Sequence, residues 1–491
     1  MFKKSFIALL LTTLLISGCS SNNNEKKDED NNDDDYLIKE DTTIEFLSML
    51  NSDYISYAEE LIKSFEEKEP HVKVILSNPL GSGNYSMLEK TVIAGFFKED
   101  YPDLVQCYPD NVVKYLAKGK AYNVDNYINN PTYGLSEEEK QDYIYSFMQE
   151  GRGYKEEGTY SLPYCKSTEL MYYNAEILIG LTINGINNSN PIDEAYLNSL
   201  TWEELFDNLC PKLEEYNGSL PENEKILSDS SRAIVTYDSD ENLFITLAEQ
   251  YGYGYTSYDK EHDVASIDFD NPEMKSLISK FKFYKDKGYF ETKYSYGTYV
   301  SSLFTAKNSL FTISSTAGVS YNFNDKNPFK VGVARLPHAA SQGNNYCSIN
   351  QGPSLCILDH KDNNRSLASF LLWKHMTSKD NSTFWSLKTG YMPIRNSSFT
   401  SEEYLASLVV NEETTLKERL EIDNRNKIAE VKEMTFNTLL FRGSGNARTN
   451  VGLLVRDCLL STDLANEIDD IFASYAEDSR TYINKDWLSK I

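Results

Sequence analysis

The stretch TTIEFLSMLNSDYISYAEELIKSFEEKEPHVKVILSN, residues 42–78, decides the fold. It opens with a partly alternating apolar run that suits a buried strand, and a second such run follows at residues 72–76. Between the two runs, Asp53 is placed to cap a helix and Pro70 to end it. The apolar stripe of this helix consists of Tyr54, Tyr57, Ala58, Leu61, Ile62 and Phe65. The stretch therefore predicts a strand, a helix and a second strand.

The same alternation continues through residue 108. The glycine-containing loop at 81–85 leads into a helical pattern that carries apolar residues from 88 to 97, and a third strand is expected at 103–108. Three strands with two helices between them are typical of a doubly wound parallel sheet, so the fold class is α/β. Ligands bind at the carboxyl ends of such strands, which makes the loops after residues 50, 76 and 108 candidate ligand loops.

The length of the chain indicates two lobes. About 450 residues follow the start of the first strand, and a single hydrophobic core rarely grows to that size. No low-complexity linker or repeat divides this part of the chain. We therefore expect each lobe to be assembled from non-contiguous segments.

The N-terminus has the features of an export signal. Two lysines precede an apolar run at 6–16 that is too short to span a bilayer of roughly 30 Å. It ends in LISGC at 15–19, which resembles the lipobox of bacterial lipoproteins; an ordinary secretory signal or an uncleaved anchor is the alternative. The resemblance implies that residues 1–18 are removed and that Cys19 carries a lipid, the only membrane attachment. Residues 19–41 are acidic and poor in apolar side chains, so we expect a disordered tether.

Charge and composition narrow the range of ligands. A formal net charge of −26 argues against a nucleic-acid partner, although it leaves room for a small anionic ligand at a locally positive site. The six cysteines after Cys19 form no Cys-x-x-Cys pair, so buried free thiols are expected rather than disulfides. The five histidines lack metal-ligand spacing. We expect no metal, no other cofactor and a monomeric protein.

A series of short blocks occurs in a fixed order. They are YPDLV at 101–105, KGKA at 118–121, VD at 124–125, LPY at 162–164, YYN at 172–174, TWEEL at 201–205, the run at 304–313, VGVARLP at 331–337, GPSL at 352–355 and TGYMPI at 389–394. Together they resemble the extracellular solute-binding proteins of ABC importers, a family that includes maltose-binding and glycerol-3-phosphate-binding proteins.

This resemblance implies a two-lobed, periplasmic-binding-protein-like α/β fold that holds a solute in the cleft between its lobes. The first lobe would contain 42–158 and 299–337, and the second 159–298 and 338–491, joined by a hinge of two or three crossing segments. The partners would be ABC permease subunits in the membrane and a sugar, polyol or sugar phosphate. The protein would act outside the cytoplasm, anchored by lipid to the outer face of the cell membrane.

Within the family, the glycerol-3-phosphate-binding branch is the most similar. Its cleft residues carry over to Tyr85, Ser167, Ser315, Thr316, Gly352, Tyr391 and Arg448. The branch's acidic residue falls on Pro109, and Asp110 is its possible replacement. Tyr237, Asp238, Asp240 and Glu241 lie where the branch places cleft tryptophans. Hydroxyls and one guanidinium suit a phosphate or a polyol, whereas the carboxylates suit a neutral sugar, so the solute class stays open.

Two other classes of protein compete with this interpretation. A surface glycosidase requires a pair of carboxylates across a cleft, and with 74 acidic residues such pairs arise by chance. No catalytic motif singles out a pair, so we expect the protein not to be an enzyme. A structural or adhesive lipoprotein would not need the ordered blocks.

Overall fold

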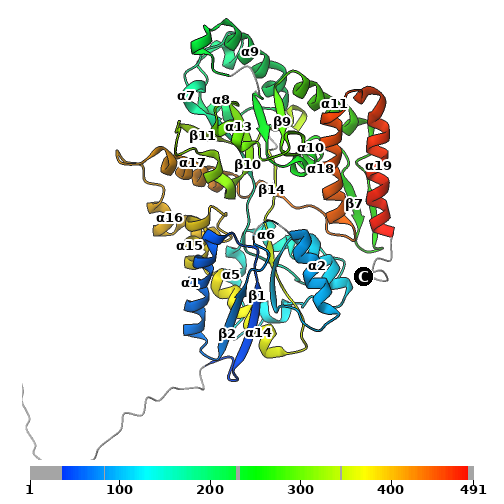
Figure 1. Ribbon diagram of the computed structural model, residues 1–491. Coiled ribbons are helices and arrows are strands. Elements are labelled where there is room, and N and C mark those ends of the chain that lie inside the picture. The colour runs from blue at the N-terminus through cyan, green and yellow to red at the C-terminus, as the bar shows by residue number, and fades with distance from the viewer. Residues whose placement is uncertain (1–35, 82, 84, 228–232, 343–345, 485–491) are drawn as a thin grey trace, which may run out of the picture.

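The computed structural model describes residues 36–81, 83, 85–227, 233–342 and 346–484, which form two lobes stacked one above the other (Figure 1). The proposed signal segment and Cys19 lie outside these residues. Of the expected tether, only 36–41 are described, and here the expectation of disorder is wrong, because Ile38 is 1 % exposed and packs in the core of the first lobe.

The first lobe is built around a five-stranded sheet with the order β2-β1-β3-β13-β4. Its elements are β1 (Thr42–Leu47), α1 (Ser52–Lys68), β2 (Val72–Ser77), α2 (Tyr85–Phe96), β3 (Leu104–Cys107), α3 (Pro109–Ala117), α4 (Asp125–Ile128), α5 (Glu137–Asp142), α6 (Tyr145–Glu150), β4 (Leu162–Pro163), β13 (Ser354–Ile357), α14 (Asn363–Met376), α15 (Lys379–Thr389), η7 (Asn396–Thr400) and α16 (Glu402–Ala406).

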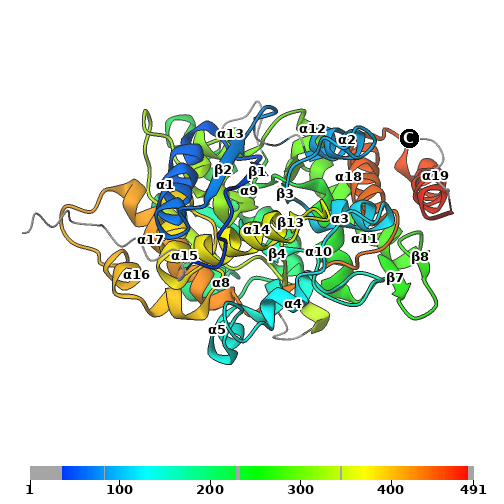
Figure 2. The ribbon, with the colours of Figure 1, turned by 90° about the horizontal axis from the view of Figure 1, so that it is seen from below.

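Strands β1, β2 and β3 are parallel, as the sequence predicts. Ile44 and Phe46 belong to the core that α1 and α14 cover, whereas Leu47 belongs to the core under α2 and α3. Helices therefore cover both faces of this sheet, with α1 and α14 on one side and α2 and α3 on the other (Figure 2). Helix α1 begins earlier than predicted, because Asn51 rather than Asp53 accepts the cap hydrogen bonds.

The second lobe has a mixed five-stranded sheet with the order β11-β5-β10-β6-β9. Its elements are β5 (Glu169–Asn174), α7 (Ala175–Leu178), η2 (Asn187–Ser189), α8 (Glu194–Asn198), η3 (Glu204–Leu209), α9 (Cys210–Ser219), η4 (Glu222–Glu224), β6 (Val235–Tyr237), α10 (Asp240–Tyr251), β7 (Thr256–Asp259), β8 (Val264–Ile267), α11 (Pro272–Asp286), β9 (Phe290–Thr292), α12 (Lys293–Tyr296), α13 (Ser301–Thr305), β10 (Phe311–Ser315), η5 (Thr316–Asn322), β11 (Val331–Ala334), η6 (Ala340–Gln342), α17 (Leu416–Val431), α18 (Ser444–Leu460) and α19 (Leu464–Asn484).

The strand pairing corrects the expected division into lobes. All six residues of β5 are buried, and the strand is paired on both edges by β10 and β11. The segment 299–337 therefore contributes its strands to the second lobe, not to the first. Conversely, β13 pairs with β3, so the chain returns to the first lobe after residue 353. Helices α18 and α19 pack on each other, and α18 packs on α10 of the second lobe.

Candidate functional site between the lobes

Three segments run side by side where the lobes meet. The first joins β4 to β5, the second contains β12 (Ser348–Ile349), and the third contains β14 (Thr435–Phe436), which pairs with β12. Ser167 and Gln351 exchange backbone hydrogen bonds of 2.9 and 3.0 Å, which join the first segment to the second. This short three-stranded ribbon forms the junction about which the lobes can move relative to each other.

A buried ion pair anchors this ribbon to the first lobe. The ammonium of Lys166, 0 % exposed, contacts the carboxylate of Glu150 and donates a 3.1 Å hydrogen bond to the carbonyl oxygen of Gly352. Asn350 donates to the other carboxylate oxygen of Glu150 at 3.3 Å. Each polar group of the pair thus has a partner, which a buried charge requires.

The first lobe presents a group of tyrosines at the ends of its elements. Tyr85, the first residue of α2, packs edge to face on Tyr108 with 4.6 Å between ring centroids, and its hydroxyl accepts a 3.3 Å hydrogen bond from Gln106. Tyr391 lies edge to face with Tyr54 at 6.4 Å. Burial, and then the neighbouring Tyr108, raises the pKa of Tyr85 well above its ordinary value. These phenols therefore stay protonated at neutral pH and can donate hydrogen bonds.

The second lobe places one cation opposite this group. Arg448, in the first turns of α18, donates a hydrogen bond to Asn242 Oδ1. Burial would lower the pKa of Arg448, but Glu241, Asp110 and Tyr108 act on it and the net shift is upward. The guanidinium therefore stays charged, with the carboxylates of Glu241 and Asp110 in its electrostatic environment.

One hydrogen bond connects the lobes next to Arg448. Ser444 Oγ, at the start of α18, donates to Asp110 Oδ1 of α3 at 2.6 Å. The helices approach closely because α18 has glycine at 445, where a Cβ would lie 3.3 Å from the Asp110 Cβ. A narrow crevice, with no room for a water molecule, adjoins this contact. It is lined by Asp110, Tyr255, Thr256, Thr438, Leu439, Phe441, Ser444 and Arg448.

The arrangement leaves one donor group and one acceptor without partners. Of the three guanidinium nitrogens of Arg448, only Nη2 donates to an acceptor in the described part of the chain. The buried Oε2 of Glu241 accepts from no donor there. A buried polar atom without a partner costs free energy, so these groups favour a ligand that both accepts and donates hydrogen bonds. The tyrosine rings add faces on which a flat or ring-shaped ligand can pack.

The nine residues singled out from the sequence lie in three kinds of place. Tyr85, Asp110, Tyr391 and Arg448 come together between the lobes. Ser315 is half-buried at the end of β10, where its hydroxyl caps η5 by accepting from the Ala317 backbone.

The remaining four lie inside the structure. Tyr237 is 0 % exposed and its hydroxyl donates to Glu169, and the hydroxyl of Thr316 accepts from the Thr168 backbone. Ser167 and Gly352 are buried in the crossing ribbon. All four residues are buried in this structure, and a role for them in contacting solute stays a prediction.

Sequence reasoning missed Tyr108 and Asn242, and it mentioned Glu241 without including it among the site residues. Tyr108 directly follows β3, in one of the loops named as candidate ligand loops, so its position carried a usable signal. Asn242 carried none, because its role depends on Arg448, which lies 206 residues away in the sequence.

Known proteins resemble this chain in both sequence and fold. A family model described as bacterial extracellular solute-binding protein matches residues 60–408, more than half of the chain. The chain belongs to this family. It is thus an extracytoplasmic solute-binding protein of an ABC importer and not an enzyme.

A curated relative is the sn-glycerol-3-phosphate-binding periplasmic protein of Salmonella typhimurium, 23 % identical over 370 residues that make up 73 % of this chain and 75 % of the relative. The structure of UgpB from Mycobacterium tuberculosis in complex with glycerophosphocholine matches with a TM-score of 0.67 and 18 % identity, covering 90 % of this chain and 98 % of that chain. The structure of MalE from Bdellovibrio bacteriovorus bound to maltotriose matches with a TM-score of 0.61 and 12 % identity, covering 89 % and 100 %. These likenesses confirm the two-lobed solute-binding fold.

In the described part of the chain, no helix has the length and apolar character needed to cross a membrane. The same residues contain no group of three or more histidine, cysteine or acidic side chains arranged to hold a metal ion. The six cysteines among the described residues are free thiols, and all but Cys347 are buried.

Proposed function

We propose that this solute-binding protein captures a hydroxyl-rich solute, a carbohydrate or a glycerol-phosphate-type molecule, between its lobes and delivers it to a membrane permease. The observation that carries this proposal is a pair of unmatched groups on the second-lobe helices α10 and α18: guanidinium donors on Arg448 and an acceptor on Glu241. Sugar hydroxyls accept from the first and donate to the second. Tyr85, Tyr108 and Tyr391 supply the aromatic surface for such a solute.

A neutral carbohydrate fits the charges best. The guanidinium of Arg448 already faces the carboxylates of Glu241 and Asp110, so a phosphate dianion would meet one cation and two acidic groups. A glycerol-phosphate-type solute is the second candidate. It is favoured by the name of the Salmonella relative and by Arg448, since a guanidinium pairs well with phosphate oxygens.

The Glu241→Gln variant distinguishes the two candidates by the sign of its effect. For a neutral sugar, the variant loses a charge-assisted hydrogen bond and binding should weaken by about 1.5 to 3 kcal/mol. For a phosphate, it removes a repelling charge and binding should strengthen. Calorimetric titration with sugars, polyols and their phosphates measures both, and Glu249→Gln, at an exposed position of the same helix, is the control.

Two further variants test the rest of the site. Arg448→Gln should weaken the binding of a phosphate by about 2 to 5 kcal/mol, whereas Tyr391→Ala should be the more damaging variant for the binding of a sugar. If no solute in the panel is sensitive to Arg448, Glu241 or Tyr391, the proposed location is wrong. Solution scattering with and without the bound solute should show compaction, because contacts with both lobes favour the closed state.

The proposal also includes attachment to the membrane. It places a lipid on Cys19, which would hold the folded lobes at the outer face of the membrane as a monomer. The support is the LISGC run and the polar segment after it.

A further inference from the structure

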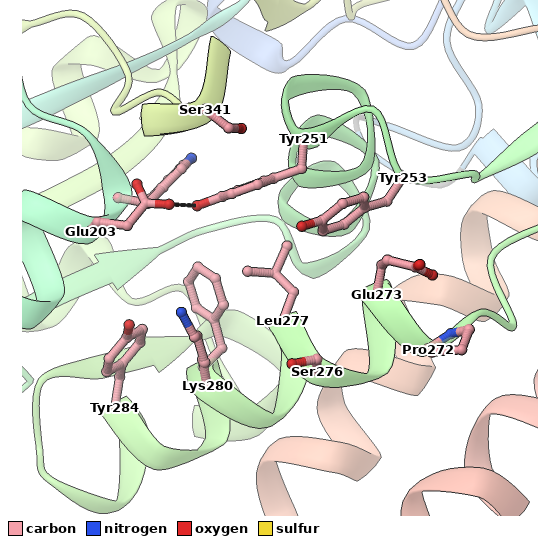
Figure 3. A pocket seen from close by; sticks show the side chains of 12 residues that line it. Glu203, Tyr251, Tyr253, Pro272, Glu273, Ser276, Leu277, Lys280, Tyr284 and Ser341 are labelled. Carbon is pink, nitrogen blue, oxygen red and sulfur yellow. Dashed lines mark hydrogen bonds between the residues drawn. The ribbon is translucent and has the colours of Figure 1, made fainter. Parts of the chain in front are cut away.

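A larger cavity lies on the second lobe, away from the site between the lobes. It has a volume of about 460 Å³ and lies between the C-terminal end of α10 and helix α11 (Figure 3). This volume is within the range of small-molecule sites. Glu241 and Tyr251 lie at opposite ends of α10, so the cavity is about 15 Å along the helix from the solute site. One ligand of ordinary size cannot fill both.

Aromatic side chains form the walls of this cavity. The rings of Tyr251 and Tyr253 are stacked with 5.4 Å between centroids. Trp202 is 2 % exposed, and its indole nitrogen is already satisfied by a 2.7 Å hydrogen bond to Gln250. Leu277 and Phe281 of α11 complete the lining but are 8 % and 1 % exposed, so the half-buried rings of Tyr251 and Tyr253 supply the accessible aromatic surface. Such surfaces pack against the C–H faces of sugar rings.

A fixed polar pair lies beside the aromatic wall. The Tyr251 hydroxyl donates to Glu203 at 2.7 Å (Figure 3). The other carboxylate oxygen of Glu203 accepts from the Ala340 backbone at 3.2 Å. Two bonds thus hold the carboxylate in place, while both of its oxygens keep lone pairs for a ligand hydroxyl. Burial, followed by the bond to Glu203, raises the pKa of Tyr251, which keeps this phenol protonated.

The rim carries polar groups without partners. Within the described part of the chain, no hydrogen bond or ion pair engages the side chains of Glu273, Ser276 or Lys280, nor the hydroxyl of Tyr253. The first three of these lie along helix α11, which borders the cavity (Figure 3). The set contains both donors and acceptors, as the hydroxyls of a sugar require.

The charges of the lining disfavour an anionic ligand. Glu203 and Glu273 together outweigh Lys280, so an anion would be repelled, whereas a neutral ligand meets no such penalty. We propose that this cavity is a second binding site, specific for a neutral saccharide and separate from the site between the lobes.

The test fills the cavity without disturbing the core. Ser276 is exposed at the rim, so Ser276→Trp places an indole in the opening, while Phe283→Trp, at a side chain 54 % exposed on the same helix and outside the cavity lining, is the matched control. The probes are methyl α-D-glucopyranoside, methyl β-D-galactopyranoside and N-acetyl-D-glucosamine, observed by saturation-transfer NMR. For at least one probe, Ser276→Trp should raise the Kd about tenfold or more, whereas the control should match wild type.

Two results would overturn the proposal. One is that no probe shows saturation transfer that depends on residue 276. The other is that glucose 6-phosphate binds in preference to the neutral probes and loses its binding in Lys280→Gln, which would make the cavity an anion site. Circular dichroism of each variant establishes that a loss of binding does not come from unfolding.

Discussion

The buried ion pair at the junction offers the sharpest test of how the lobes are held together. In Lys166→Met, the long apolar stem is kept and the ammonium is removed, which leaves the carboxylate of Glu150 in the interior without its counter-charge. Glu150 keeps only longer hydrogen bonds, of 3.3 Å from Asn350 and 3.4 Å from Ser354. The carbonyl oxygen of Gly352 also loses its 3.1 Å donor.

The expected cost follows from the burial of both partners. The side chains of Lys166 and Glu150 are 0 % and 9 % exposed, and removing one partner of a buried pair costs about 3 to 5 kcal/mol. Domains are stable by about 5 to 15 kcal/mol, so the variant should lose a large part of its stability. Lys166→Met combined with Glu150→Gln should recover most of the loss, because no charge is then left buried.

Urea unfolding followed by circular dichroism measures these differences. Lys140→Met is the matched control, since Lys140 pairs with Glu137 at 2.7 Å but the Glu137 side chain is 81 % exposed, and such pairs contribute about 0 to 1 kcal/mol. The reasoning fails if Lys166→Met costs no more than this control. It also fails if the double variant loses as much as the two single variants together.

Three further predictions concern the junction, the pH dependence and the anchor. Gly352→Ala should strongly destabilise the folded protein, because φ at this position is +96° and the new Cβ would lie 2.0 Å from the Cys165 carbonyl oxygen. Gly180→Ala is the control: φ is +86° but the space around it is open, so it should cost only about 1 to 2 kcal/mol of stability in thermal unfolding. Burial raises the pKa of Glu169 from 4.5 to about 7, so the contribution of the protonated side chain to stability is present at low pH and is lost as the pH rises through that interval. The melting temperature of the Glu169→Gln variant should therefore fall less than that of the wild type over the same pH range. Cys19→Ala should shift the protein from the detergent phase to the aqueous phase, and equal partitioning would exclude a lipid there.

The first 70 or so residues of the folded part could be interpreted from sequence because their pattern is local. Strands β1 to β3 and helices α1 and α2 follow from apolar periods that each segment carries by itself. The candidate loops also follow, since every parallel strand of a sheet ends at the same edge. Tyr85 and Tyr108 lie at this edge, and so does Asp110, one residue into α3.

Contacts between distant segments depended on the tertiary structure. A buried strand such as β10 has no local feature that selects its sheet, and only its pairing with β5 placed residues 311–315 in the second lobe. Tyr237 resembles the cleft tyrosines in sequence, yet packing of the second-lobe core buries it. The bond from Arg448 to Asn242 joins α18 to α10 across 206 residues. The sequence by itself thus determined the class of fold and the sheet edge at which we expect a ligand, because those follow from local periodicity. The membership of each lobe and the side chains that meet between the lobes follow from long-range packing, which no local pattern encodes.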